Sequence, residues 1–260
     1  MSENVHPRAD ELDSMSVDDF LQVMHEEDLN AVRAIAPALE QMARTVDQVA
    51  GRLRAGGRLH YFGAGTSGMI AALDAVECPA TFGVDRELVQ AHVATEPEQE
   101  DDRKLGEFAA GEARMRDHDV AVGVSASGKT AFVLGAFDRA AAVGALRIAL
   151  TCNPGSALGQ SADLAIEVAT GPEVIAGSTR LKAGTVQKLL LNMLSTAVFT
   201  RLGHTHRGRM VGVVAANDKL RERAAHIVAD LTGMSLEDAR RRLKETRGDI
   251  RAVLTAVRTQ

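Results

Sequence analysis

Aromatic residues are scarce in this chain, which has no tryptophan, one tyrosine and seven phenylalanines among 260 residues. Any hydrophobic core must therefore be built mainly from aliphatic side chains and methionine. The two cysteines, Cys78 and Cys152, form neither a CxxC motif nor a disulfide framework, although a single disulfide between them is an alternative. No apolar run is long enough to cross a bilayer, and the N-terminal MSENVHPRADELD lacks the apolar segment of a secretion signal. We therefore expect a reduced, cytoplasmic protein without a membrane partner.

The charge balance is mildly acidic. Thirty lysines and arginines face 35 aspartates and glutamates, giving a net charge of −5 and a pI near 5.9. No basic block stands out, so a nucleic-acid partner has no support. The length fits one domain of moderate size, or one core with a small appendage.

The central part of the chain alternates between short apolar runs and helical patterns. The runs are rich in aliphatic and β-branched residues and cover 58–63, 88–94, 119–125, 146–151 and 164–168. Helical patterns cover 69–76, 105–116, 130–143 and 156–161. Such alternation predicts an α/β fold, a three-layer α/β/α sandwich around a five-stranded parallel sheet.

Helical patterns flank this region on both sides. Ser16 is a predicted N-cap, and a long helix over 29–55 is expected to kink at Pro37. Another long helix runs from about 181 to Gly203, and three short helices, one capped by Ser235, are expected in 217–260. The predicted division is an N-terminal helical segment (1–56), a central domain (57–216) and a small C-terminal module (217–260).

Three predicted strands are followed by short loops rich in glycine and hydroxyl groups, namely GAGTSG, SASGKT and TCNPGS. In a parallel sheet these loops meet at the carboxyl edge, where such folds bind ligands. Each loop also leads into a helix N-terminus, which favours a phosphate. The predicted ligand-binding residues in the first two loops are Gly65, Thr66, Ser67, Ser125, Ser127 and Thr130.

Other interpretations of these loops remain open. A dinucleotide site expects an acid about 20 residues after GxGxxG, but the acid that ends the second strand, Glu96, lies about 30 residues on. SASGKT contains the Gly-Lys-Thr of a P-loop, yet Gly123 falls inside the predicted strand. Each loop alone also fits an ordinary tight turn with an N-capping serine. The three loops together favour a phosphate ligand.

Several acidic residues are candidates for catalysis or binding. Glu77, in DAVECP, ends a predicted helix, where the dipole disfavours a carboxylate, so it is either catalytic or simply solvated. The acidic run 96–102 alone fits a solvated loop and lacks the histidines or cysteines of a metal cluster. Glu173 is either a ligand or a helix-start acid, and Lys182 either neutralises a ligand or pairs with an acid.

Together these segments resemble one family. GAGTSG, DAVECPATFGV, SASGKT, TCNPGS and the long block GPEVIAGSTRLKAGTVQKLLLNMLST are similar to the N-acetylmuramic acid 6-phosphate etherases of the sugar-isomerase (SIS) superfamily. The resemblance covers about 10–217 and implies the SIS fold. It also implies a carbon–oxygen lyase of amino-sugar catabolism in cell-wall recycling, with no metal or organic cofactor.

The resemblance further implies site residues and a partner. Glu77 would be the acid and Glu100 the base, with Glu98 and Asp101 as alternatives for the base, while Glu173 and Lys182 would help bind the substrate. The family's active site is completed by a second subunit, so a homodimer is expected. Leu189, Leu190, Met193 and Leu194 are candidate interface residues, or else ordinary core. A non-catalytic sugar-phosphate regulator and an aldose–ketose isomerase are the alternative functions.

Overall fold

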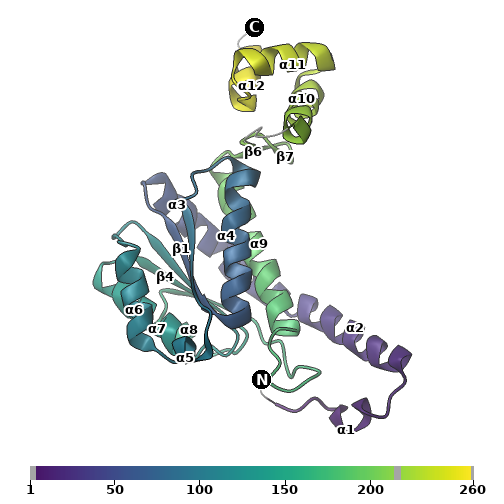
Figure 1. The fold of residues 1–260 in the computed structure, drawn as a ribbon, viewed down its shortest axis with the longest axis vertical. Coiled ribbons are helices and arrows are strands. Elements are labelled where there is room, and N and C mark those ends of the chain that lie inside the picture. Colours follow the sequence, from purple (N-terminus) through teal and green to yellow (C-terminus); the bar gives the residue numbers. More distant parts are fainter. Residues whose placement is uncertain (1–3, 214–217, 259–260) are drawn as a thin grey trace.

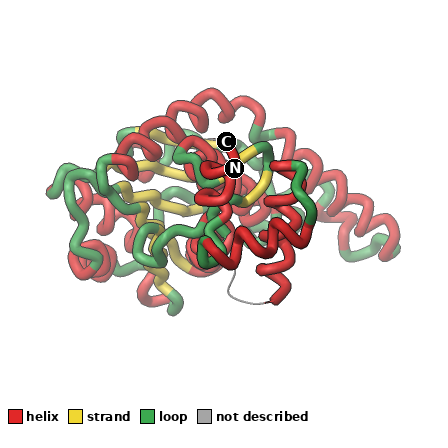
Figure 2. Tube along the Cα trace, turned by 90° about the horizontal axis from the view of Figure 1, so that it is seen from above, coloured by secondary structure: helices red, strands yellow, loops and turns green. Residues whose placement is uncertain are grey.

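A five-stranded parallel sheet forms the centre of the computed structural model, which describes residues 4–213 and 218–258. The strand order is β2-β1-β3-β4-β5, with β1 between β2 and β3 (Figures 1 and 2). All five predicted strands are confirmed within a residue or two. They are β1 (Leu59–Ala64), β2 (Val89–Ala94), β3 (Val120–Ser125), β4 (Leu146–Thr151) and β5 (Leu164–Glu167).

Helices cover both faces of the sheet, which confirms the three-layer sandwich. Side chains alternate along β1, so Leu59 and Tyr61 face one layer while Phe62 faces the other. The first layer consists of α3 (Leu39–Arg54), α4 (Gly65–Phe82) and α9 (Lys182–Arg201). The second consists of α6 (Arg103–Glu112), α7 (Ala131–Ala142) and α8 (Ala157–Ser161).

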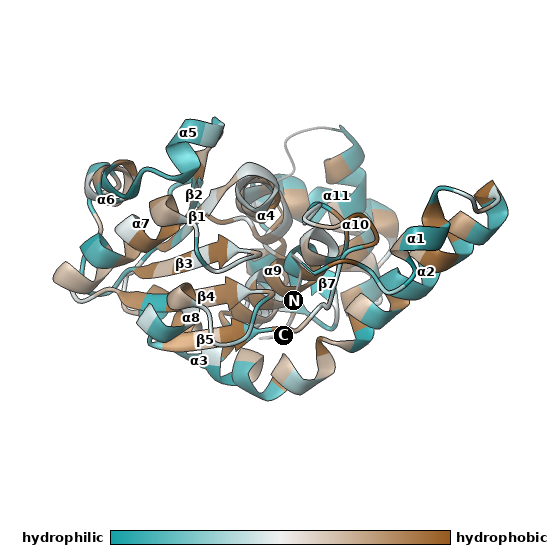
Figure 3. Ribbon diagram, turned by 90° about the horizontal axis from the view of Figure 1, so that it is seen from below, coloured by the Kyte–Doolittle hydropathy of each residue, from teal (hydrophilic) through white to brown (hydrophobic). Residues whose placement is uncertain are grey.

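The N-terminal helices differ from the prediction at Pro37. The expected kinked helix over 29–55 is instead two helices, α2 (Val17–Arg33) and α3, joined by a short 3-10 turn, Ala36–Ala38. Proline has no backbone N–H to continue the helical ladder, so the chain breaks there. The Ser16 cap is confirmed, because its hydroxyl accepts the N–H of Asp19 at 3.1 Å. Together α1 (Ala9–Leu12) and α2 extend away from the sheet (Figure 3).

Helix α4 is longer than the predicted 69–76. It begins directly at Gly65, runs through Pro79 and ends at the left-handed Gly83. The buried side chains of Cys78 and Phe82 hold its last turn in the core. Glu77 therefore lies inside the helix and not at its end, which corrects the argument from the helix C-terminus.

Besides α1, two other short elements were not predicted. Helix α5 (Pro97–Glu100) lies between β2 and α6, and a hairpin of β6 (Thr205–His206) and β7 (Arg209–Met210) follows α9. Both are too short to leave a periodic pattern in the sequence.

Three helices close the described chain, as predicted: α10 (Asp218–Thr232), α11 (Leu236–Glu245) and α12 (Ile250–Arg258). We call them the C-terminal module. They share a small core of their own, which also includes Val211 and Val213. The boundary predicted between 216 and 217 lies outside the described residues. No helix in the described ranges is long and apolar enough to span a membrane. Both cysteines are free and buried.

Candidate active site

The first loop turns from β1 into α4 by an unusually close backbone contact. A Cβ at Gly63 would lie 2.8 Å from the Cα of Gly68, and one at Gly68 would lie 2.8 Å from the carbonyl oxygen of Gly63. Only glycine fits at both positions. The packing leaves Gly65 and Thr66 exposed at the start of an 18-residue helix, with Ser67 half-buried beside them. The start of α4 can therefore receive an anion.

The second loop joins three predicted ligand residues in one hydrogen-bond network. The Ser125 hydroxyl is 2.9 Å from that of Thr130 and 3.4 Å from that of Ser127. The backbone N–H of Gly128 donates to Ser125 at 3.0 Å. These hydroxyls follow β3, and the first loop follows β1. Since the strand order reverses between β1 and β3, both loops flank the crevice where such sheets bind ligands.

Glu100 joins this network from the neighbouring loop. Its carboxylate accepts the Thr130 hydroxyl proton at 3.3 Å, so Ser125 must donate in turn to Thr130. In this series of hydrogen bonds, Ser125 donates to Thr130 and Thr130 donates to Glu100. The short helix α5 holds Glu100 through a capping box, in which Gln99 accepts the backbone N–H groups of Thr95 and Glu96. The Glu100 carboxylate is thus a hydrogen-bond acceptor at the end of this network.

Glu173 lies elsewhere at the same edge and performs a structural task. Its side chain is fully buried, and its two oxygens accept the backbone N–H groups of Lys182 and Ala183, each at 2.9 Å. The carboxylate thus occupies the N-terminus of α9, where an external anion would otherwise bind.

The substitution Glu173→Gln should lower the free energy of unfolding by about 1–3 kcal/mol, because one buried N–H would then meet an amide donor. Urea unfolding measures this effect. Glu112→Gln is the matched control, since Glu112 is exposed, and it should change stability by less than about 0.5 kcal/mol. Equal stability of the two variants would contradict the capping role.

Lys182 is buried and forms an ion pair with Glu27, a residue that was not among the predicted site residues. Burial raises the pKa of Glu27, but the hydrogen bond and charge of Lys182 outweigh it and leave the pKa below its usual value. His6, also buried, has its Nε2 3.8 Å from Glu27 and accepts the Arg8 N–H at Nδ1. The N-terminal segment is thereby tied to the start of α9.

Glu77 lies away from the loops of its own subunit. It is half exposed and forms an ion pair with Lys188 of α9 at 3.1 Å. Twelve residues of α4 separate it from Gly65, which corresponds to about 18 Å of helix axis. One subunit therefore brings together Glu100, Thr130, Ser125 and Ser127 but not Glu77.

Sequence reasoning also missed a buried acid, Asp74, one turn before Glu77. Its carboxylate accepts protons from Tyr61 at 2.9 Å and from Ser195 at 3.0 Å, joining α4 to β1 and α9. Burial raises the pKa of Asp74, against the lowering effect of these two hydrogen bonds. An acid in the buried stripe of a mostly apolar helix was the signal that could have revealed it.

A second buried polar cluster lies beneath the sheet's other face. His60 is fully buried, with its Nδ1 3.1 Å from Nε2 of His92 and its Nε2 3.8 Å from Asp119. Asp119 also binds Arg58 and Arg116. Burial lowers the pKa of His60 to about 3, and that of His92 to about 4. Both rings are therefore neutral at pH 7.

No three histidine, cysteine or acidic side chains gather into a metal-binding group among the residues that the structure describes. The site consists of hydroxyl groups, helix N-termini and a carboxylate.

Comparison with known proteins identifies the class of protein. Residues 104–197 match the SIS domain, and residues 37–119 match the second SIS domain of the glucokinase regulatory protein.

Solved structures share this fold. A phosphoheptose isomerase from Francisella tularensis aligns with a TM-score of 0.55 and 19% identity, over 72% of this chain and all of that one. NanR from Vibrio vulnificus, solved with ManNAc-6P, aligns with a TM-score of 0.54 and 19% identity, over 72% of this chain and 65% of that one. The protein is thus an α/β protein of the SIS class.

Sequence relatives define the family more narrowly. The N-acetylmuramic acid 6-phosphate etherase of Thermobifida fusca is 47% identical over 96% of this chain and 84% of the relative. That of Geobacillus thermodenitrificans is 41% identical over the whole chain and 90% of the relative. The chain belongs to the N-acetylmuramic acid 6-phosphate etherase family, as its motifs predicted.

Proposed function

We propose that this protein is a carbon–oxygen lyase that cleaves the D-lactyl ether of N-acetylmuramic acid 6-phosphate. The products are N-acetylglucosamine 6-phosphate and D-lactate. In the opened sugar the C1 aldehyde acidifies the C2 proton. Loss of that proton and of the lactate oxygen from C3 leaves a C2–C3 double bond. Water then adds a hydroxyl to C3 and a proton to C2.

Each predicted residue has a role in this proposal. Glu100 removes the C2 proton, and Glu77 protonates the departing lactate oxygen. Thr66, Ser67 and the backbone at Gly65 receive the phosphate or sugar hydroxyls together with Ser125, Ser127 and Thr130. Glu173 contributes by holding the start of α9, where Lys182 is fixed by Glu27.

One observation carries the proposal: the hydrogen-bond chain that runs from Ser125 through Thr130 to Glu100. It joins the Glu100 carboxylate to hydroxyl groups at the switch point of the sheet, in a chain whose relatives are named etherases. A bound sugar could hydrogen-bond to these hydroxyls while its C2 proton faces the carboxylate.

A homodimer would supply the second carboxylate. Helix α4 exposes an apolar stripe of Met69, Leu73 and Val76, which are 62%, 47% and 76% exposed. Such a stripe favours a covered interface. If two copies pair these stripes in antiparallel fashion, each Glu77 faces the partner's α4 near residue 68, beside the first loop.

The sequence-based interface must be corrected accordingly. Leu190 and Leu194 are fully buried within one subunit, because they face the sheet, and they cannot meet a partner. Met193 is exposed and remains a candidate, and Leu189 is half-buried.

The proposal is tested by incubating the purified protein with N-acetylmuramic acid 6-phosphate and measuring D-lactate. Release of D-lactate with formation of N-acetylglucosamine 6-phosphate is the expected result. Tight binding of the sugar phosphate without lactate would overturn the lyase and favour the non-catalytic regulator. Interconversion of aldose and ketose phosphates without lactate would favour an isomerase.

A further inference from the structure

The N-terminal arm, which we define as residues 4–33, carries an apolar surface that its own subunit leaves uncovered. Val17, Leu21 and Val32 lie on one side of α2, and Val17 is 75% exposed. The neighbouring side, with Ala31, packs against the core, and Val23 is also buried. The arm is also strongly acidic, with eight aspartates and glutamates against two arginines.

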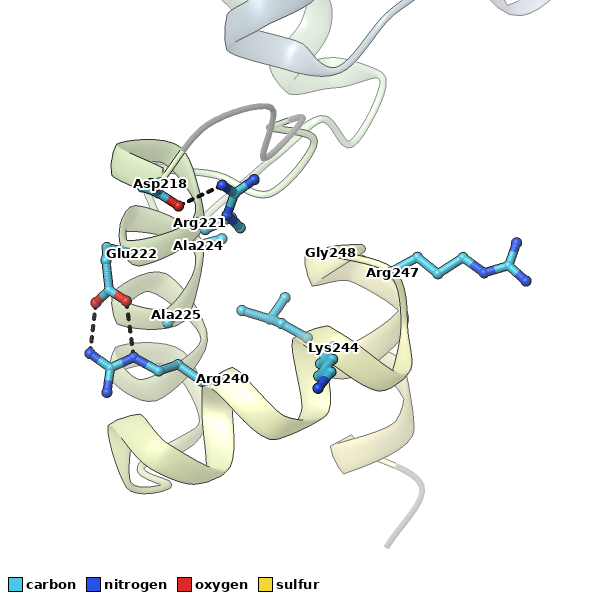
Figure 4. Close-up of a pocket in the computed structure, with 10 residues that line it drawn as sticks. Asp218, Arg221, Glu222, Ala224, Ala225, Arg240, Lys244, Arg247 and Gly248 are labelled. Carbon is cyan, nitrogen blue, oxygen red and sulfur yellow. Dashed lines mark hydrogen bonds and ion pairs between the residues drawn. The ribbon is translucent and has the colours of Figure 1, made fainter.

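The C-terminal module offers a surface of the opposite character. A cavity of about 680 Å³ lies between α10 and α11, with Ala224, Ala225 and Leu243 on its walls. Four basic residues line it, namely Arg221, Arg240, Lys244 and Arg247, and the side chain of Arg247 extends outward from its rim (Figure 4).

The charges around this cavity are only partly balanced within the module. Glu222 pairs with Arg240, and Asp218 pairs with Arg221. The side chains of Lys244 and Arg247 form no hydrogen bond or ion pair with any described residue. Residues 218–258 contain ten lysines and arginines against seven acids, whereas the chain as a whole is negative.

Within one subunit the two surfaces cannot meet, since they lie at opposite ends of the molecule (Figure 1). The arm is attached at the start of α9 through Glu27 and Lys182. The module follows the other end of the same layer, where the backbone of Gly212 packs against that of Gly83 at the end of α4.

We propose that in the dimer the acidic arm of each subunit docks in the basic cavity of its partner's module. The inference rests on the antiparallel dimer proposed above, because antiparallel α4 helices bring the arm end of one copy to the module end of the other. Exposed apolar side chains of α2 would enter the cavity above Ala224, Ala225 and Leu243, which the packing of the module already buries. Opposite charges around them would fix the register and speed association.

A charge exchange tests this contact. The arm variant carries Asp18→Lys and Asp28→Lys, and the module variant carries Lys244→Glu and Arg247→Glu. None of these four side chains forms a hydrogen bond or ion pair with another described residue. Each variant alone should weaken the dimer at least tenfold at low ionic strength, as measured by sedimentation velocity over a dilution series.

Two further samples test whether the arm and the module are in direct contact. A chain carrying all four substitutions should recover the wild-type dimer, and an equimolar mixture of the two double variants should form a heterodimer tighter than either homodimer. A general loss of folding cannot produce either recovery. Wild-type dimerisation of both double variants, or failure of both recoveries, would overturn the proposal and leave the cavity to another partner.

D-lactate release distinguishes this inference from the proposed function. If the wild-type dimer is active but the exchange has no effect, only the arm contact fails. If the exchange restores the dimer but no lactate appears, the contact stands and the lyase fails.

Discussion

Two inactive variants of this protein should restore activity when they are mixed. Glu77→Gln and Glu100→Gln should each lower the rate of D-lactate release by about 10²–10⁴-fold, the usual contribution of a general acid or base. If each site takes Glu77 from one subunit and Glu100 from the other, a hybrid dimer has one site with both carboxylates intact. Random exchange makes half of the dimers hybrids, so about a quarter of the wild-type activity should return.

The experiment separates two arrangements of the site. The variants are mixed, allowed to exchange subunits, and assayed for D-lactate beside each variant alone. The control is a mixture of Glu112→Gln with Glu100→Gln. In that mixture only the sites that contain the intact Glu100 of a Glu112→Gln subunit should be active. Absence of recovery in the first mixture, with hybrids demonstrated by mass, would mean that both carboxylates act within one subunit or that one assignment is wrong.

The protein should lose stability steeply in mild acid. The folded-state pKa values of His60 and His92, about 3 and about 4, lie well below the usual 6.5. As the pH falls below about 6.5, these two histidines therefore bind protons in the unfolded chain but stay neutral in the folded chain. The free energy of unfolding should decline between pH 6.5 and pH 4, by an amount on the order of a few kcal/mol.

Urea unfolding from pH 7.5 to pH 4.5 measures this dependence. The variant His60→Gln, His92→Gln should be less stable at pH 7 but show a much flatter pH profile. Asp119 acts in a lower range: burial raises its pKa, but the bonds from Arg58 and Arg116 hold that pKa below its usual value. An unchanged slope in the double variant would show that other groups govern the acid response.

Most of the fold could be predicted because its elements are long enough to leave a pattern. Five apolar runs bounded by glycine or polar residues predicted the strands, and Ser16 and Ser235 predicted two helix starts that the structure confirms. Two of the misplaced helix boundaries lie near prolines. Pro37 divides two helices that share one amphipathic pattern, whereas Pro79 lies inside α4, whose apolar side chains continue past it into the core.

The site could be predicted only in part. Glycine and hydroxyl patterns located the loops, because backbone geometry and helix starts demand those residue types. The contact between Glu100 and Thr130 joins residues 30 apart and depends on α5, whose four residues leave no periodicity. The pairing of Lys182 with Glu27 spans 155 residues, and no local pattern encodes it. The resemblance named the roles of Glu77 and Glu100 but not the distance between them.

Helix α4 sets the distance and the angle between the first loop and Glu77. A rigid α-helix advances 1.5 Å and turns about 100° with each residue, so the spacing of Gly68 and Glu77 fixes both the reach and the direction of the acid. A single inserted residue between them would rotate Glu77 away from the apolar stripe that it borders. An insertion of seven residues would restore the direction of the Glu77 side chain but lengthen the helix by about 10 Å. If Glu77 is the acid of the proposed reaction, the number of residues in this segment matters as much as their identity.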